Sequence, residues 1–429
     1  MFGFVLFYLV AFLISYRVYQ RIAHPVVVFN FLWFVLLLIS IYGNLDKTMG
    51  FYQPSSNTYL VFLIGGISFN VGALLFHFIT GTKNKRQKEV VSFSSLSKER
   101  ANLLTIAEMV LAVYYTFKSV AIARYLLSGQ TYEVIRLLYF SEDMITSPLE
   151  SAFIIFVSDP LLLLTEILFS INLFTHIFPK KLNYLMMFNL LLRTFISGGR
   201  TALFETGCLI IICAIYFGYL KNLRSKKTLG IIAAVYALVF LLVKVSSQRH
   251  GDEGGVMEIA YNNLVSYFIG SFAFFEDLLV SHDYLPQTYG MVTFGGISDI
   301  FIQIFRYLQL TDMPLTYIST GSILSEFRLI GDGVSYNAMP TMYYYFFTDF
   351  REFGYVLCPF VFGGISALIY NQMIRSRSEL HFVYYMFIMV LIVESSFNWW
   401  LERIPFFLAV VFAYLLFRPS FNDKTHVCL

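Results

Sequence analysis

The chain has 429 residues, of which 58% are apolar and 13% are charged, with 30 basic and 27 acidic side chains. Soluble domains carry roughly 25% charged residues, so this chain has too few polar side chains to cover a surface that faces water. Its mean hydropathy of +0.68 excludes a soluble monomer, and its continuous apolar runs argue against the alternating strands of a membrane β-barrel. The composition therefore predicts an all-α polytopic membrane protein.

Eleven apolar segments are candidate membrane-spanning helices, since about 20 apolar residues cross the hydrocarbon core. They cover about 2–16, 26–43, 59–80, 103–123, 153–178, 182–196, 201–220, 228–245, 353–370, 380–397 and 404–417. The first segment has neither a preceding basic region nor a small-residue cleavage site, so we interpret it as a retained span and not as a signal peptide.

These segments divide the chain into an N-terminal bundle (1–245), a long connection (246–352) and C-terminal spans (353–429). Apolar stretches with embedded charges at 264–280 and 291–310 predict amphipathic or re-entrant helices within the connection, and thirteen spans if both cross the membrane. Lys and Arg are twice as frequent on one set of alternate connections as on the other. By the positive-inside rule, the N-terminus and the long connection lie outside and the C-terminus lies inside.

The basic residues of the predicted outer side are almost all arginines. A guanidinium grips a phosphate with two hydrogen bonds and sheds water more easily than an ammonium, so this bias favours a phosphate-bearing ligand; pairing with outer carboxylates is the alternative. Lys118, Arg193 and Lys244 fall in the outer third of their predicted spans, which indicates a polar cavity that opens outward. A proton-driven transporter would instead place such groups near the midplane.

The most distinctive local motif is the turn at 197–201, where Gly198 and Gly199 precede Arg200 between two apolar runs. Two glycines let the backbone approach a ligand and expose amide donors beside the guanidinium, at the start of the next helix, which is an anion-binding arrangement. Arg193 lies seven residues earlier, on the same face if the helix continues. A simple glycine turn is the alternative.

Two further clusters lie on the predicted outer side. Arg249 and His250 open the long connection, and the stretch 337–354 closes it with tyrosines followed by acidic residues and an arginine. Tyrosine and tryptophan rings at a membrane surface serve as anchors or, alternatively, as faces on which sugars stack. The rings considered for sugar binding are Tyr343, Tyr344, Trp399 and Trp400.

Several common signatures are missing from the sequence. It contains no P-loop and no GxGxxG motif, which argues against nucleotide cofactors, and no GxSxG or HExxH motif of common hydrolases. No DxD pair and no His or Cys cluster suggests a metal site. We therefore predict no cofactor and no metal, so any pyrophosphate would be neutralised by arginine and lysine.

The chain resembles the Wzy-type oligosaccharide repeat-unit polymerases of bacterial O-antigen and capsule assembly. The resemblance covers the spans, the long outer connection in the second half, the Gly-Arg turn at 197–201 and the stretch 337–354. Some members carry an arginine followed ten residues later by glycine in outer loops. No outer arginine here has that spacing, so their catalytic arginines do not transfer by motif.

The resemblance implies a metal-independent glycosyltransferase with a GT-C-like architecture in the bacterial cytoplasmic (inner) membrane. It would move a growing glycan from one undecaprenyl pyrophosphate carrier to the terminal sugar of another lipid-linked repeat unit at the outer face. Its partners would be these donor and acceptor lipids, the bilayer, a flippase and a chain-length regulator, but no nucleic acid. An O-antigen ligase, or a lipid-glycan flippase or other transporter, is the alternative.

In such a reaction, the charge that develops on the leaving pyrophosphate must be stabilised by side chains. The arginines predicted to act there are Arg200, Arg249 and Arg351. Further anion-binding residues are Arg193, Gly198, Gly199, Lys244 and Arg328. The acceptor hydroxyl also needs a base, and the sequence leaves four candidates open, which are Asp349, Glu352, Glu326 and His250.

Overall fold

The computed structural model describes residues 2–45, 50–80, 91, 93, 96–130, 134, 138, 147–197, 201–219, 230, 270–337 and 339–418. The chain divides into two compact units. The first unit comprises Met1–Gln87, Gly218–Asn371 and Ile388–Ile404, and the second comprises Lys88–Phe217, Gln372–Phe387 and Pro405–Leu429. The three sequence divisions follow chain order, whereas each unit combines segments that are distant in sequence. The predicted boundary at 245 lies outside the described residues.

Most of the described residues are helical, and the only described strands form a short hairpin. The helices of the first half are α1 (Phe2–Tyr19), α2 (Pro25–Leu45), α3 (Ser56–Thr80), α4 (Lys98–Leu127), α6 (Pro148–Phe153), the π-helical turn η2 (Ile154–Ser158), α7 (Asp159–Thr175), α8 (Lys180–Ser197) and α9 (Thr201–Tyr216). The second half contains α12 (Gly295–Tyr307), α13 (Thr316–Leu324), β1 (Arg328–Gly331), β2 (Val334–Tyr336), α14 (Met342–Phe350), η4 (Arg351–Phe353), α15 (Gly354–Ser376), α16 (Glu379–Glu394), η5 (Trp400–Glu402) and α17 (Ile404–Phe417).

Within the described residues, six helical segments are long and apolar enough to cross a membrane, as expected for an all-α membrane protein. They are Phe2–Tyr19, Pro25–Gly43, Ser56–Thr80, Lys98–Leu127, Pro148–Thr175 and Met342–Ser376. Thr201–Tyr216 and Ile404–Phe417 are shorter apolar helices. The predicted span at 228–245 falls almost wholly outside the described residues, so the total of eleven spans stays a prediction.

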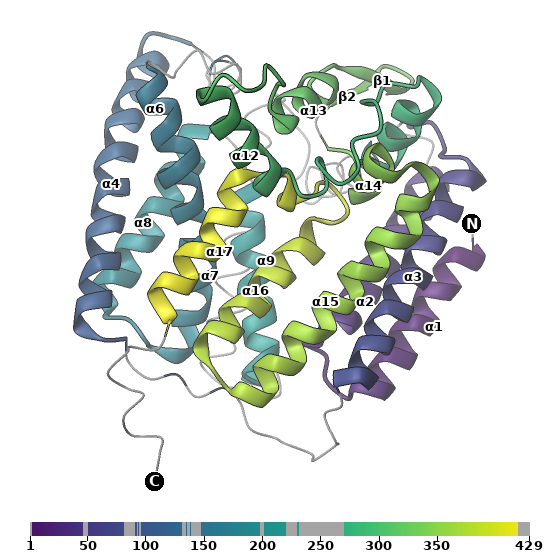
Figure 1. The fold of residues 1–429 in the computed structure, drawn as a ribbon, viewed down its shortest axis with the longest axis horizontal. Coiled ribbons are helices and arrows are strands. Elements are labelled where there is room, and N and C mark those ends of the chain that lie inside the picture. Colours follow the sequence, from purple (N-terminus) through teal and green to yellow (C-terminus); the bar gives the residue numbers. More distant parts are fainter. Residues whose placement is uncertain are drawn as a thin grey trace. The chain divides into compact units, whose positions relative to one another are not determined.

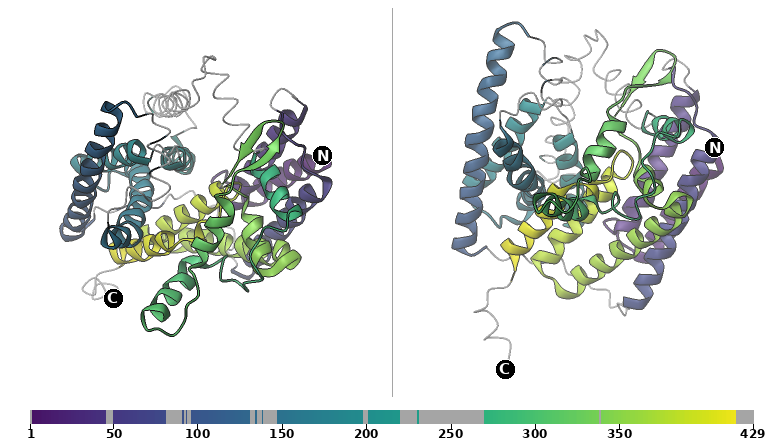
Figure 2. Two further views of the ribbon diagram at one scale, coloured as in Figure 1. Left: turned by 90° about the horizontal axis from the view of Figure 1, so that it is seen from above. Right: turned by 45° about the horizontal axis from the view of Figure 1, so that its top comes forward.

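In the first unit, α1, α2 and α3 pack with one another, and α3 packs against α15 (Figure 1 and Figure 2). Glycines allow close approach, because a Cβ at Gly72 would overlap the backbone carbonyl of Phe360. Trp33 is fully buried at the centre, where its ring lies 5.3 Å from that of Phe62 and 5.5 Å from that of Tyr343. This aromatic packing fixes α14 against the spans.

The two ends of the first unit are built from different connections. At one end, the Asp332 amide donates to the Gly50 carbonyl (2.7 Å) and the Tyr52 amide donates to that of Ile330 (2.9 Å). The segment 50–55 therefore pairs with the β1–β2 hairpin. At the other end, Asn371 Nδ2 donates to Thr80 Oγ1 (2.7 Å). We call the end with the hairpin the connection end. The topology prediction likewise assigns segments 50–55 and 270–352 to one side.

The second unit is a helical bundle with polar side chains paired inside it. Glu108, on α4, is buried and accepts hydrogen bonds from Thr165 Oγ1 (2.5 Å) and Asn189 Nδ2 (2.6 Å). These residues come from α7 and α8, so one carboxylate joins three helices. An unsatisfied carboxylate would be costly in this apolar interior, which explains the pairing.

We expect Asn189→Leu to destabilise the second unit by about 1–3 kcal/mol, because it leaves the buried Glu108 carboxylate short of a donor. Thermal unfolding of the purified chain in detergent measures the loss. Met187→Leu, at an exposed position of the same helix, is the matched control and should leave the unfolding temperature unchanged. Equal unfolding temperatures for the two variants would contradict this role of Asn189.

Candidate functional site

Arg351 is the most unusual cation at the connection end. It follows α14 directly and has a φ of +53°, a backbone conformation that residues other than glycine rarely adopt. Its guanidinium carbon lies 4.7 Å from the ring centroid of Tyr284 and 5.3 Å from that of Phe347. One terminal nitrogen donates to the Leu285 carbonyl (2.9 Å). The other, Nη1, is buried and has no hydrogen-bond partner among the described residues.

This arrangement leaves Arg351 with an unused hydrogen-bond donor. Aromatic rings on the guanidinium orient it and exclude water, but they do not satisfy its N–H groups. Backbone strain of this kind persists only where surrounding structure enforces it, and it is typical of functional sites. An anionic oxygen would supply the missing acceptor.

Asp349 stands two residues before Arg351 and is fully buried. Its carboxylate accepts from Thr288 Oγ1 (2.5 Å) and from the amides of Val292 (3.1 Å) and Thr293 (2.5 Å). Three donors from one turn therefore surround it. This carboxylate holds the turn that leads into α12, and its placement does not support the predicted role as a base.

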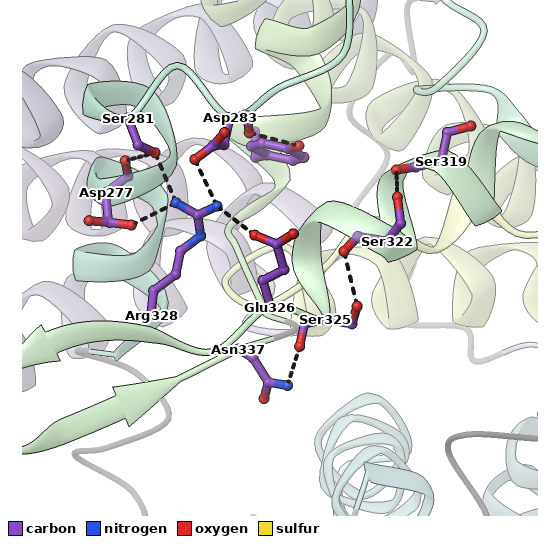
Figure 3. A network of polar contacts seen from close by, with 10 residues as sticks. Asp277, Ser281, Asp283, Ser319, Ser322, Ser325, Glu326, Arg328 and Asn337 are labelled. Atoms are coloured by element: carbon purple, nitrogen blue, oxygen red, sulfur yellow. Dashed lines mark hydrogen bonds and ion pairs between the residues drawn. The ribbon is translucent and has the colours of Figure 1, made fainter.

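Arg328, in contrast to Arg351, is surrounded by acidic groups (Figure 3). It forms ion pairs with Asp277 (3.1 Å), Asp283 (2.8 Å) and Glu326 (3.4 Å). It also donates to Ser281 Oγ (2.9 Å), and its hydrogen bond lowers the pKa of the Asp283 carboxyl. Negative charge exceeds positive charge here, so this placement does not favour anion binding by Arg328 or a base role for its partner Glu326.

Glu352 is the predicted base that the structure leaves accessible beside Arg351. It is exposed in the turn η4, directly after the arginine. His250, the remaining base candidate, lies outside the described residues.

The four rings considered for sugar binding have different environments. Tyr343 and Tyr344 are buried in the core, which does not support a sugar-binding role for either. Trp399 is also buried, and its Nε1 donates to the Thr293 carbonyl (2.8 Å). Trp400 is partly exposed, with the guanidinium of Arg403 5.2 Å from its ring centroid. It is the only one of the four that presents surface to a ligand.

Two buried carboxylates at the connection end were not among the predicted site residues. Asp299, on α12, accepts from the Thr316 amide (2.7 Å) and the Tyr317 amide (3.2 Å), so it caps the start of α13. Glu402, in η5, accepts a hydrogen bond from the hydroxyl of Thr320, which also belongs to α13. Leu315 precedes α13 and cannot cap it. The absence of a capping side chain at this position is visible in the sequence and indicates that another group must accept hydrogen bonds from the first amides of α13. The sequence does not indicate which distant carboxylate does so.

Ion pairs in the second unit engage predicted cations. Arg193 contacts Asp159 (3.2 Å), and Lys118 contacts Glu150, which also accepts from Tyr114 OH (3.0 Å). They lie near the π-helical turn η2, a distortion common at functional sites. The sequence analysis placed both cations in the outer third of their predicted spans, but it did not identify their acidic partners.

Other predicted residues cannot be placed. Gly198, Gly199, Arg200, Lys244 and Arg249 lie outside the described residues, so their roles stay predictions. Within the described ranges, no group of three or more His, Cys, Asp and Glu side chains could hold a metal ion.

Comparison with known proteins does not assign a family. A scan against protein-family models found no match, and searches of curated proteins and of solved structures found none either. The function is therefore inferred from the residues themselves.

Burial raises the pKa of the Glu402 carboxyl from 4.5 to about 8. Asp299 and Asp349 raise it further, whereas Thr320 and Arg403 lower it. The folded state thus favours the protonated acid, so its contribution to stability is complete below about pH 4.5 and is lost as the pH rises through about 8.

We expect Glu402→Gln, which cannot ionise, to flatten this pH dependence. As the pH rises from about 5 to 8, the unfolding temperature of the variant should increase relative to that of the parent chain. Thermal unfolding in detergent across this range measures the difference. Parallel profiles for the two proteins would refute the assignment.

Proposed function

We propose that this chain is a membrane glycosyltransferase that polymerises oligosaccharide repeat units carried on undecaprenyl pyrophosphate. The observation that carries the proposal is the guanidinium of Arg351, which two aromatic rings hold in place and whose buried Nη1 has no partner among the described residues. A departing pyrophosphate needs such a preorganised donor, because its negative charge increases as the glycosidic bond to the lipid carrier breaks.

The position of Arg351 along the chain supports a lipid-borne phosphate as the ligand. The arginine begins the three-residue turn η4, which leads into α15, and the 23 residues of α15 extend about 34 Å, enough to cross the hydrocarbon core. A residue at the start of such a helix lies at the level of lipid headgroups. Phosphates that are attached to a membrane-anchored chain lie at this same depth.

The proposed reaction is a substitution at the anomeric carbon of the donor glycan. A hydroxyl of the acceptor sugar attacks this carbon, a new glycosidic bond forms, and the bond to the pyrophosphate oxygen breaks. Arg351 stabilises the leaving pyrophosphate. Glu352 takes the proton of the attacking hydroxyl, since it is the exposed carboxylate beside this arginine. Trp400 is the ring proposed to contact sugar.

The finer features of the proposal are those expected from the sequence. They are eleven spans, a GT-C-like architecture and a bacterial inner-membrane location with the connection end outside. Arg200, Arg249 and Lys244 retain their proposed anion-binding roles. Arg193 belongs to the second unit and is paired with Asp159, so the proposal does not depend on it.

We expect Arg351→Ala to reduce polymerisation by about 10²- to 10³-fold, as removal of a donor directed at developing charge does in other enzymes. Arg351→Lys should restore only part of the rate, because an ammonium lacks the planar fork. The assay incubates the purified chain in nanodiscs with a defined lipid-linked repeat unit and follows the ladder of products.

Arg306→Ala is the matched control, since this arginine is exposed in the same part of the chain. It should leave the ladder unchanged. If Arg351→Ala forms the ladder at the parent rate, the role of Arg351 is refuted. If the parent chain forms no ladder from a repeat unit of its own source, the polymerase proposal itself fails.

A further inference from the structure

Helix α12 exposes an apolar stripe that runs along its whole length. Ile297, Phe301, Ile304 and Leu308 recur at intervals of three and four residues, which places them on one helical face. Their exposed fractions are 38%, 55%, 49% and 56%. Phe305 extends the same stripe and is 46% exposed. This face is unlike the surface of a soluble helix.

The opposite face of α12 is anchored in the first unit. A Cβ at Gly295 or Gly296 would overlap the backbone carbonyl of Glu402 or Arg403. Asp299, on the same side, is fully buried and holds the start of α13. The helix therefore cannot rotate to bury its apolar stripe within the unit without breaking these contacts.

The depth of α12 follows from the backbone that its glycines touch. Glu402 and Arg403 belong to the connection between the apolar helices α16 and α17, so α12 begins at the level where α16 has ended. With 13 residues, α12 extends about 20 Å, too short to cross the hydrocarbon core. A short amphipathic helix at this level matches the geometry of an interfacial helix.

We infer that α12 lies in the membrane interface, with its apolar stripe among the acyl chains of the adjacent leaflet. The occupant of the stripe is bilayer lipid, because the described part of the chain has six helices that could cross a membrane, and the lipid they require extends to the ends of those helices. Acyl chains would remove these large apolar side chains from water, and the stripe has no polar side chain that such contact would bury. This inference is independent of the proposed catalytic function.

Tryptophan fluorescence in nanodiscs tests the inference. The full chain carrying Ile304→Trp or Ile297→Trp, one copy per disc, is measured in phosphatidylcholine with and without brominated acyl chains, and the emission of the parent chain is subtracted. Gln303→Trp is the control, because Gln303 lies on the same helix but outside the stripe. All variants are first checked for parent-like unfolding temperatures.

Bromine should quench the emission from positions 297 and 304 at a depth of about 5–10 Å below the headgroups, and it should leave the control largely unquenched. Equal quenching of all three variants, or none at 297 and 304, would overturn the inference. Loss of the quenching at positions 297 and 304 in discs that hold two copies would also overturn the inference, because a second chain would then cover the stripe.

Discussion

The connection end of the first unit depends on three buried carboxyl groups that accept hydrogen bonds from other segments of the chain. Asp349 binds the turn before α12, Asp299 binds the start of α13, and Glu402 binds α13 from the connection before α17. A buried polar group is costly unless it is hydrogen-bonded, so each carboxyl group favours the arrangement that supplies its donors. Together they join α12, α13, α14 and η5 into one structure.

This framework gives Arg351 and Arg328, two arginines of the connection end, opposite environments. α14 is fixed by its aromatic packing and by Asp349, and the chain that leaves it adopts the unfavourable backbone conformation of Arg351. The guanidinium of Arg351 then rests between two rings with one donor unused. Arg328 instead meets three carboxylates and ties β1 to the segment 277–283 (Figure 3). Of these two arginines, Arg351 is the one that leaves a terminal donor, Nη1, for the anion of the proposed function.

The amino-acid pattern predicted the features that depend on composition and local sequence. Apolar runs of sufficient length mark the spans, because the hydrocarbon core imposes a fixed length on any helix that crosses it. The embedded charges at 291–310 likewise indicated an amphipathic helix, and α12 lies there. Arg351 was also among the predicted residues, because it follows a run of aromatic residues just before a predicted span, and its role stays a prediction.

Features that depend on distant contacts could not be predicted. The ring of Tyr343 could anchor at a membrane surface, stack on a sugar or pack in a core, and its contact with Trp33 is evident only in three dimensions. The carboxylates of Arg328 come from several segments, so no spacing in the sequence reveals that its charge is already neutralised. Asp349 also appears as a plausible base until its three donors are seen.

Binding of undecaprenyl pyrophosphate tests the central claim most directly. Native mass spectrometry of the full chain, released from detergent after incubation with this lipid, measures the fraction that retains it. The account predicts retention by the parent chain and by Arg306→Ala, and loss by Arg351→Ala at an unchanged unfolding temperature. Equal retention by Arg351→Ala and the parent chain would contradict the account.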